Sequence, residues 1–195
     1  RELPFDDQFE VAVVAVGGEE EPLAVAGDHA VLDAARADVR AARVEAVVPV
    51  LLLAEADEQH PLGLLFCDLD HFKAVNDALG HRGGDRFISI IADRLQRSIE
   101  PGSVAGRMGG DEFVVVMPGM DIAAAANVGH RLVGMLAQPV YAEGREVPSS
   151  VSIGVASYPA NATGASELLR HANAALYRAK SGGRNRIEIF DSSMR

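Results

Sequence analysis

A chain of 195 residues with a net charge of −10 can bury one substantial core, and its acidity excludes a typical nucleic-acid-binding surface, which must neutralise phosphates. The single cysteine, Cys67, excludes an internal disulfide and is typical of a reducing compartment. No apolar run approaches the roughly twenty residues that cross a bilayer. We therefore expect a cytoplasmic location and no nucleic-acid partner, and any polyphosphate ligand would have to be bound locally by a metal ion and a few cations.

The first sixty residues differ in pattern from the rest of the chain. Residues 1–30 hold a β-branched apolar run followed by Gly17 and Gly18, which predicts the tail of an upstream domain. Residues 31–57 are rich in Ala, Arg and Val, which predicts a helical linker or first helix that Pro49 kinks or ends. Because the chain begins with Arg1, we expect a piece of a longer protein, whose sensor or membrane segments lie elsewhere.

From Pro61 onward, short apolar runs alternate with helical patterns. The run from Pro61 to Cys67 has the length of a buried strand, and Phe72–Leu79 predicts a short helix. The later elements, in order, are a Gly-rich loop, a helix over 85–99 with Asp85 as its N-cap, a hairpin over 104–117, a helix over 122–136, hairpin-like strands over 147–158, a helix over 166–181 and a final strand over 186–190. This order predicts an α/β or α+β domain of two layers.

Two pairs of acidic residues follow strand-like runs. Asp68 and Asp70 end the first strand, where buried carboxylates are costly unless they meet a cation. Gly109 and Gly110 predict a tight hairpin turn, and Asp111 and Glu112 follow at once. Successive strand residues point to opposite faces, so one of these two carboxylates can face a site while the other braces the turn. If the two segments are neighbours, Asp68 and Asp111 converge on a hard divalent cation such as Mg²⁺.

Three motifs together resemble one known family. The string from Gly109 to Phe113 is similar to the signature of the GGDEF family, the diguanylate cyclases. The segment from Asp68 to Asp85 resembles the family's metal and guanine-binding segment, and the segment from Ala175 to Asn185 resembles its phosphate-binding helix end. The resemblance covers about residues 60 to 190, and we assign residues 58–191 to the domain. It implies a palm-like nucleotidyl-cyclase fold, in which helices surround a central mixed β-sheet that carries the GGDEF hairpin.

The resemblance also implies a reaction. Two GTP molecules condense into cyclic di-GMP with release of two pyrophosphates, and each domain holds one GTP, so the active form is a homodimer. Asp68, the Leu69 carbonyl and Asp111 hold two Mg²⁺ (or Mn²⁺) ions. Asp111 accepts the proton of the ribose 3′-OH, and Glu112 serves as a further catalytic group or, by our preference, braces the hairpin.

The same resemblance assigns residues to the substrate. Asn76 and Asp85 read the guanine edge, to which an amide and a carboxylate offer the right donors and acceptors. The expected phosphate ligands are the cations Lys73, Lys180 and Arg184. Phe72 and His81 complete the set of expected substrate-binding residues. Simpler explanations stay open, because Lys180 and Arg184 also follow a helix whose dipole favours cations, and Phe72 suits a core. Asp70 and Asp77 are equally explained by helix capping or by solvation.

Two departures from the family pattern and one further resemblance leave alternatives open. The usual opening turn, Asp-x-Leu-Thr-Gly-Leu-x-Asn-Arg, is missing. Glu100 and Ser103 stand where the family's inhibitory Arg-x-x-Asp product site would lie, which predicts that this product site is lost. Residues 186–195 resemble the junction into an EAL phosphodiesterase domain, with 192–195 as the start of the linker. The alternative functions are therefore a GTP-binding regulatory module that controls an attached EAL domain, or a purely structural dimerisation domain.

Overall fold

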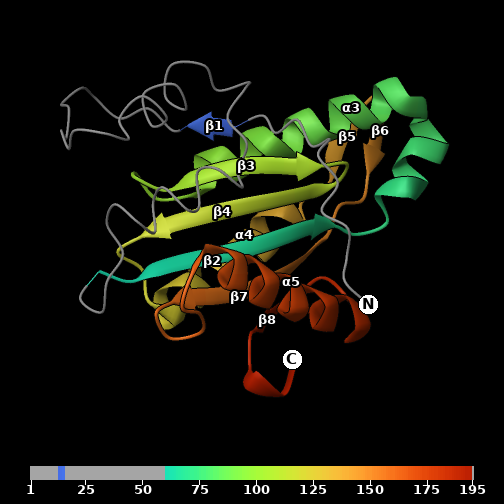
Figure 1. Cartoon of the computed structure of the whole chain (residues 1–195). Coiled ribbons are helices and arrows are strands. Elements are labelled where there is room, and N and C mark those ends of the chain that lie inside the picture. Colours follow the sequence, from blue (N-terminus) through green and yellow to red (C-terminus); the bar gives the residue numbers. More distant parts are fainter. Residues whose placement is uncertain (1–12, 16–59, 195) are drawn as a thin grey trace.

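The computed structural model describes residues 13–15 and 60–194. They form a six-stranded sheet whose strands are ordered β1–β3–β4–β2–β7–β8 (Figure 1). The strands of this sheet are β1 (Val13–Ala15), β2 (Leu62–Leu69), β3 (Val104–Gly109), β4 (Glu112–Pro118), β7 (Val151–Tyr158) and β8 (Ile187–Ile189). Apart from β1, the predicted upstream tail and helical linker over 1–57 lie outside the described residues.

Strand β2 lies in the middle of the sheet. It pairs antiparallel with β4 on one side and with β7 on the other, while β7 pairs in parallel with β8, so the sheet is mixed as predicted. All eight residues of β2 are buried, which explains why its sequence is almost continuously apolar. The strand runs to Leu69, two residues beyond the predicted end, and Asp68 is therefore part of the ladder.

Helices cover both faces of the sheet (Figure 1). On one face, Leu65, Cys67 and Leu69 pack in a core with residues of α3 (Phe72–Ser98) and α4 (Ile122–Leu136). On the other face, Leu64 and Phe66 pack in a core with α5 (Ala165–Ser181). The prediction of two layers was therefore wrong: the sheet is sandwiched between helices. Because side chains alternate along a strand, Asp68 belongs to the face covered by α5.

Helix α3 is bent where a loop was predicted. It runs from Phe72 to Ser98 with non-helical torsion angles at Gly80, where φ is 70° and ψ is 172°. Glycine takes this positive φ without a Cβ clash. Gly83 and Gly84 lie within the helix, and Asp85 lies in its interior rather than at an N-cap, so the predicted Gly-rich loop and the predicted cap were both wrong.

A small hairpin that was not predicted lies beside α3. Strands β5 (Val140–Ala142) and β6 (Arg145–Val147) pair with each other in a separate two-stranded sheet. The expectation of hairpin-like strands over 147–158 was wrong, because Val151–Tyr158 is a single strand that pairs with β2 and β8. A hairpin of three-residue strands has little periodicity for a sequence pattern to reveal.

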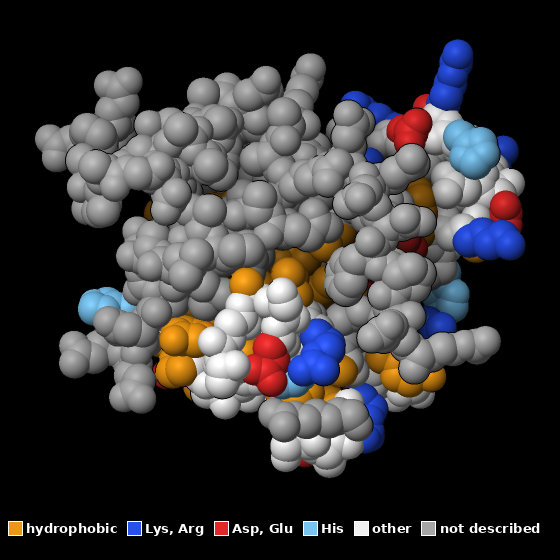
Figure 2. All heavy atoms as spheres, in the orientation of Figure 1, with side chains coloured by type: hydrophobic (Ala, Val, Ile, Leu, Met, Phe, Trp, Pro, Cys, Tyr) orange, Lys and Arg blue, Asp and Glu red, His pale blue; other side chains and the backbone are white. Residues whose placement is uncertain are grey.

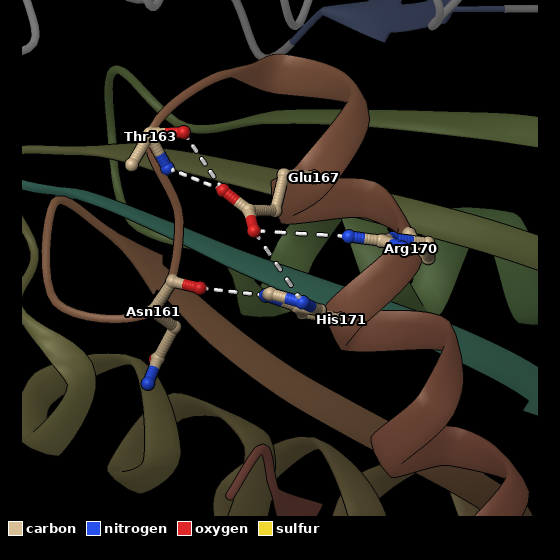
Figure 3. A network of polar contacts seen from close by, with 5 residues as sticks. All are labelled: Asn161, Thr163, Glu167, Arg170 and His171. Carbon is tan, nitrogen blue, oxygen red and sulfur yellow. Dashed lines mark hydrogen bonds and ion pairs between the residues drawn. The ribbon is translucent and has the colours of Figure 1, made fainter. Parts of the chain in front are cut away.

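Polar contacts fix the beginning of α5 (Figure 3). Glu167, in its first turn, accepts hydrogen bonds from the N–H and the hydroxyl of Thr163, both at 2.8 Å. The buried ring of His171 bonds through Nδ1 to the Asn161 carbonyl at 2.6 Å. His171 also stacks on Phe190, with ring centroids 3.8 Å apart. Helix α5 is thus tied both to the loop before it and to the chain after β8.

Helix α5 also approaches β7 closely. A Cβ added to Gly154 would lie 1.9 Å from the Ala172 carbonyl oxygen and 2.3 Å from the Leu176 nitrogen, so only glycine permits this backbone contact.

Among the described residues, no helix combines the length and the apolar character that a membrane span requires. In the view of Figure 2, the coloured surface carries charged side chains over α5 and around the bend of α3.

Candidate nucleotide and metal site

Four predicted site residues meet where the C-terminal end of β2 lies beside the N-terminal end of β4. Asp68 lies directly opposite Glu112 in the antiparallel register, so the two side chains share the face covered by α5. The next residue, Leu69, donates its N–H to the Asp111 carbonyl at 3.1 Å. The structure therefore brings the strand end and the hairpin turn together, as the sequence predicted.

Glycine and arginine shape the hairpin turn between β3 and β4. Gly110 has a φ of 53°, and the strand register shifts between Arg107 and Gly109. The Arg107 guanidinium donates two hydrogen bonds to the Gly110 carbonyl, from Nε at 2.9 Å and from Nη2 at 2.6 Å. Arg107 thus braces the turn from within. Glu112 lies beside Asp68 in the strand register, so its role as a second brace of the hairpin stays a prediction.

The carboxylates interact electrostatically. Burial raises the pKa of Asp68, and the negative charges of Asp111 and Asp70 raise it further, while Lys180 opposes the rise. Burial and the charge of Asp68 likewise raise the pKa of Glu112. Close like charges in a poorly hydrated place are costly, so this strand end attracts cations.

One cation already lies there. Lys180, near the end of α5, places its Nζ 2.7 Å from Oδ2 of Asp68, and its side chain remains 33% exposed. Within the described ranges, no group of three or more metal-ligating side chains converges on one point. Mg²⁺ needs only one or two carboxylates when nucleotide phosphates complete its shell, so Asp68 and its neighbours suit a metal that arrives with a nucleotide. The donor set therefore fits the predicted cofactor.

The two predicted guanine-reading residues lie on α3, on either side of its bend. A Cβ added to Gly84 would lie 1.8 Å from Oδ1 of Asn76, so the Asn76 amide packs against the helical turn that carries Asp85. Asp85 is exposed and lies at the rim of a cavity of about 170 Å³ between α3 and β3. Residues of α3 and of the two strands β3 and β4 line this cavity: Ile88, Ser89, Ala92, Arg107, Phe113.

The positions of the remaining predicted substrate residues say less about substrate binding. Lys73 and His81 are exposed on α3. Phe72 is half-buried, with its ring centroid 6.2 Å from that of Phe87, so it contributes to the core. Arg184 follows α5, is about half exposed, and lies 3.9 Å through Nε from Oδ1 of Asp70.

Asp70 is one of two residues, with Asp77, whose role the sequence leaves open. Its side chain is fully buried and accepts hydrogen bonds from three donors, which excludes a solvated role: Ser150 Oγ, Ser152 Oγ and Asn185 N–H. The helix that follows has His71, not Asp70, at its N-cap. No local signal could have found these contacts, because the donors lie 80 to 115 residues away in the chain.

The sequence is also similar to characterised proteins. It is 43% identical over 131 residues to MucR of Pseudomonas aeruginosa, a bifunctional diguanylate cyclase/cyclic di-GMP phosphodiesterase, covering 67% of this chain and 19% of MucR. It is 35% identical over 133 residues to NbdA, a cyclic di-GMP phosphodiesterase of the same species, covering 68% of this chain and 17% of NbdA. The chain thus spans about a fifth of the length of these curated relatives.

The fold has close structural counterparts. The crystal structure of the GGDEF domain of YfiN from P. aeruginosa superposes with a TM-score of 0.72 at 31% identity, covering 76% of this chain and 93% of that one. The mixed sheet between helices is thus the palm-like cyclase fold that the motifs implied. The family model "Diguanylate cyclase, GGDEF domain" matches residues 48–186. With its carboxylate-bearing strand end, its Gly-Gly hairpin and this match over most of its length, the chain belongs to the GGDEF family.

Proposed function

We propose that this domain is a diguanylate cyclase, which condenses two GTP into cyclic di-GMP and two pyrophosphates as a dimer of GGDEF domains. The observation that carries the proposal is the facing pair of Asp68 and Glu112 with Lys180 at 2.7 Å. A relative or a neighbouring fold supports the family, but these side chains supply the chemistry. Their charges match a metal-bound triphosphate, in which carboxylates meet cations and a lysine meets phosphate oxygens.

Each residue has a distinct task in this proposal. Asp68, the Leu69 carbonyl and Asp111 would hold two Mg²⁺ ions, which when bound would neutralise charge at the α-phosphate and lower the pKa of the attacking 3′-OH. Asp111, half-buried in the hairpin turn, accepts the proton of that hydroxyl. Glu112 adds negative charge beside Asp68. Lys180 therefore leaves Asp68 only when a phosphate of the nucleotide becomes its new partner. Dimerisation places two such sites face to face, because one domain binds only one GTP.

Base selection follows from α3. Asn76 and Asp85 lie across the bend and offer an amide and a carboxylate, which match the guanine edge. Asn76→Ala and Asp85→Ala should each weaken GTP binding about tenfold or more and leave any ATP binding nearly unchanged, because unpaired polar groups of the base are costly. Asp77→Ala, on the same exposed stretch of helix, is the matched control. Equal losses for ATP and GTP would show that these residues only support the fold.

The decisive test is turnover by the purified chain. Incubation with GTP and Mg²⁺ should produce cyclic di-GMP at a rate per domain that rises with protein concentration, because two domains must meet. The control is Asp68→Asn, which removes the proposed metal ligand. GTP binding without product at any concentration would refute the cyclase.

A second function is supported by the relatives. NbdA is named for phosphodiesterase activity alone and MucR for both activities. The alternative is a GTP-binding regulatory module that acts on an attached EAL domain, and the missing opening turn motif favours it. GTP binding without cyclase activity, together with a change in the hydrolase rate of a chain that contains both domains, would establish it.

A further inference from the structure

Asp70 holds a buried negative charge that the proposed mechanism does not use. Its carboxylate is fully enclosed and bonds Ser152 Oγ at 2.7 Å, Ser150 Oγ at 2.9 Å and the Asn185 N–H at 3.1 Å. Burying a charge is costly, and an apolar or neutral residue would serve simple packing as well. The contacts that this carboxylate makes must therefore explain why a charged residue is buried here.

Half of its contacts go to the loop after α5. The two serines belong to the β7 side of the site, where they fix the carboxylate in place. Oδ2 also accepts the Asn185 N–H, and Oδ1 lies 3.9 Å from Nε of Arg184. Asp70 thus connects the strand end that carries Asp68 to a loop 115 residues later in the chain.

This loop needs an external tether. Arg184 and Asn185 have φ values of 63° and 48°, so two consecutive residues other than glycine adopt the left-handed region. Asparagine tolerates that region, but a long side chain such as arginine rarely does. On its other side the loop is joined to α5 by the Arg184 N–H, which bonds the Ala179 carbonyl at 3.0 Å. Asp70 supplies the opposite attachment.

The tether sets where a half-exposed guanidinium lies. Two carboxylates of one strand end hold the same helix terminus at two points, since Asp68 pairs with Lys180 and Asp70 holds Arg184 and Asn185. We propose that Asp70 is a positioning residue, which keeps the Arg184 loop in its left-handed form so that the guanidinium meets the phosphates of bound GTP. This inference rests on the proposed function, in which Arg184 is a phosphate ligand.

The informative variant is Asp70→Asn. An amide NH₂ in place of Oδ2 faces the Asn185 N–H, and in place of Oδ1 it faces the Arg184 guanidinium. Either orientation loses one contact to the loop, whereas the serine hydroxyls can turn to suit an amide. Ser152→Ala is the matched control, because it removes a hydrogen bond to the same carboxylate but leaves the loop attached.

Calorimetric titration with GTP and Mg²⁺ should show binding about tenfold weaker in Asp70→Asn, and within about twofold of the wild type in Ser152→Ala. Guanosine, which has no phosphates, should bind both variants like the wild type. In an Arg184→Ala background, Asp70→Asn should have less than about a twofold further effect, because the two residues act through one contact. If Asp70→Asn does not fold, Asn185→Ala keeps the N–H but disfavours the left-handed form that the tether maintains, and it should also weaken GTP binding but not guanosine binding.

Four results would overturn the inference. They are unchanged GTP affinity in both Asp70→Asn and Asn185→Ala, equal losses for guanosine and GTP, a full effect of Asp70→Asn in the Arg184→Ala background, or an equal loss of GTP affinity in Ser152→Ala. A wild-type chain that binds no GTP at all would instead refute the proposed function on which the inference rests.

Discussion

Gly154→Ala should separate α5 from the sheet. The added Cβ would lie 1.9 Å from the Ala172 carbonyl oxygen, 2.3 Å from the Leu176 nitrogen and 2.9 Å from its Cα. All three neighbours are backbone atoms, so no side chain can rotate away. The helix must instead move by about 1.5 Å to reach ordinary van der Waals distance, against a core packed at crystal-like density.

The expected cost lies at the upper end for overpacked cores, at about 3 kcal/mol of unfolding free energy. In a chain of this size that loss lowers Tm by about 6–12 °C. The matched control is Gly134→Ala in α4, where a Cβ meets no atom within 4 Å. Because alanine favours a helix over glycine, this control should gain about 0.5 kcal/mol.

The measurements are urea denaturation of both variants and GTP turnover at a temperature where both are folded. Turnover should also fall in Gly154→Ala, because the same helix positions Lys180 2.7 Å from Asp68. An unfolding free energy within about 0.5 kcal/mol of the wild type would refute the close helix-to-strand contact, because surface substitutions without such contacts fall in that range.

Three further predictions concern the site itself. Asp111→Asn should slow cyclic di-GMP formation by a factor of about 10²–10⁴, as expected for a lost general base, and turnover within tenfold of the wild type in a product assay would contradict that role. Glu112→Gln should raise the free energy of unfolding at pH 7, because burial and the charge of Asp68 raise the pKa of the Glu112 carboxyl. Such a group contributes stability that is full below its unfolded pKa of 4.5 and is lost as pH rises through the folded pKa, so the variant should show a flatter pH dependence in denaturation, and an identical curve would argue against the shift. Cyclic di-GMP added to a GTP turnover assay should not inhibit non-competitively, because Glu100 pairs with Arg131 at 2.7 Å where a phosphate would need a free cation; strong non-competitive inhibition that Glu100→Ala abolishes would refute this.

The sequence predicted the parts of the fold whose signals are local and strong. The apolar run before Asp68 gave a central strand, and Gly109-Gly110 gave a hairpin, because a buried strand and a tight turn each leave a clear pattern. The Gly-rich stretch was misread as a loop, since glycine breaks a helix only where torsion angles require it, and here only Gly80 departs from them. Packing overrides propensity at Gly83 and Gly84.

The site was predicted in part for a similar reason. The expectation that Asp68 and Asp111 lie close together was confirmed, because β2 pairs antiparallel with β4 and the Leu69 N–H bonds the Asp111 carbonyl. The direct pairing of Asp68 with Glu112 depends on that register and was not anticipated. The burial of Asp70 could not be predicted, because its partners come from β7 and from the loop after α5, and only the folded chain brings them together.

Because Lys180 forms an ion pair with Asp68, the carboxylates at this strand end already have a cation as a partner, which any second cation has to displace. Any metal that binds Asp68 must displace the ammonium group of Lys180. The apparent free energy of binding free Mg²⁺ is therefore the difference between the free energies of the Asp68–metal and Asp68–Lys180 interactions. A nucleotide changes that balance, because its phosphates offer the displaced lysine a new partner. In the proposed cyclase, metal and nucleotide should therefore bind cooperatively, and each should bind weakly without the other.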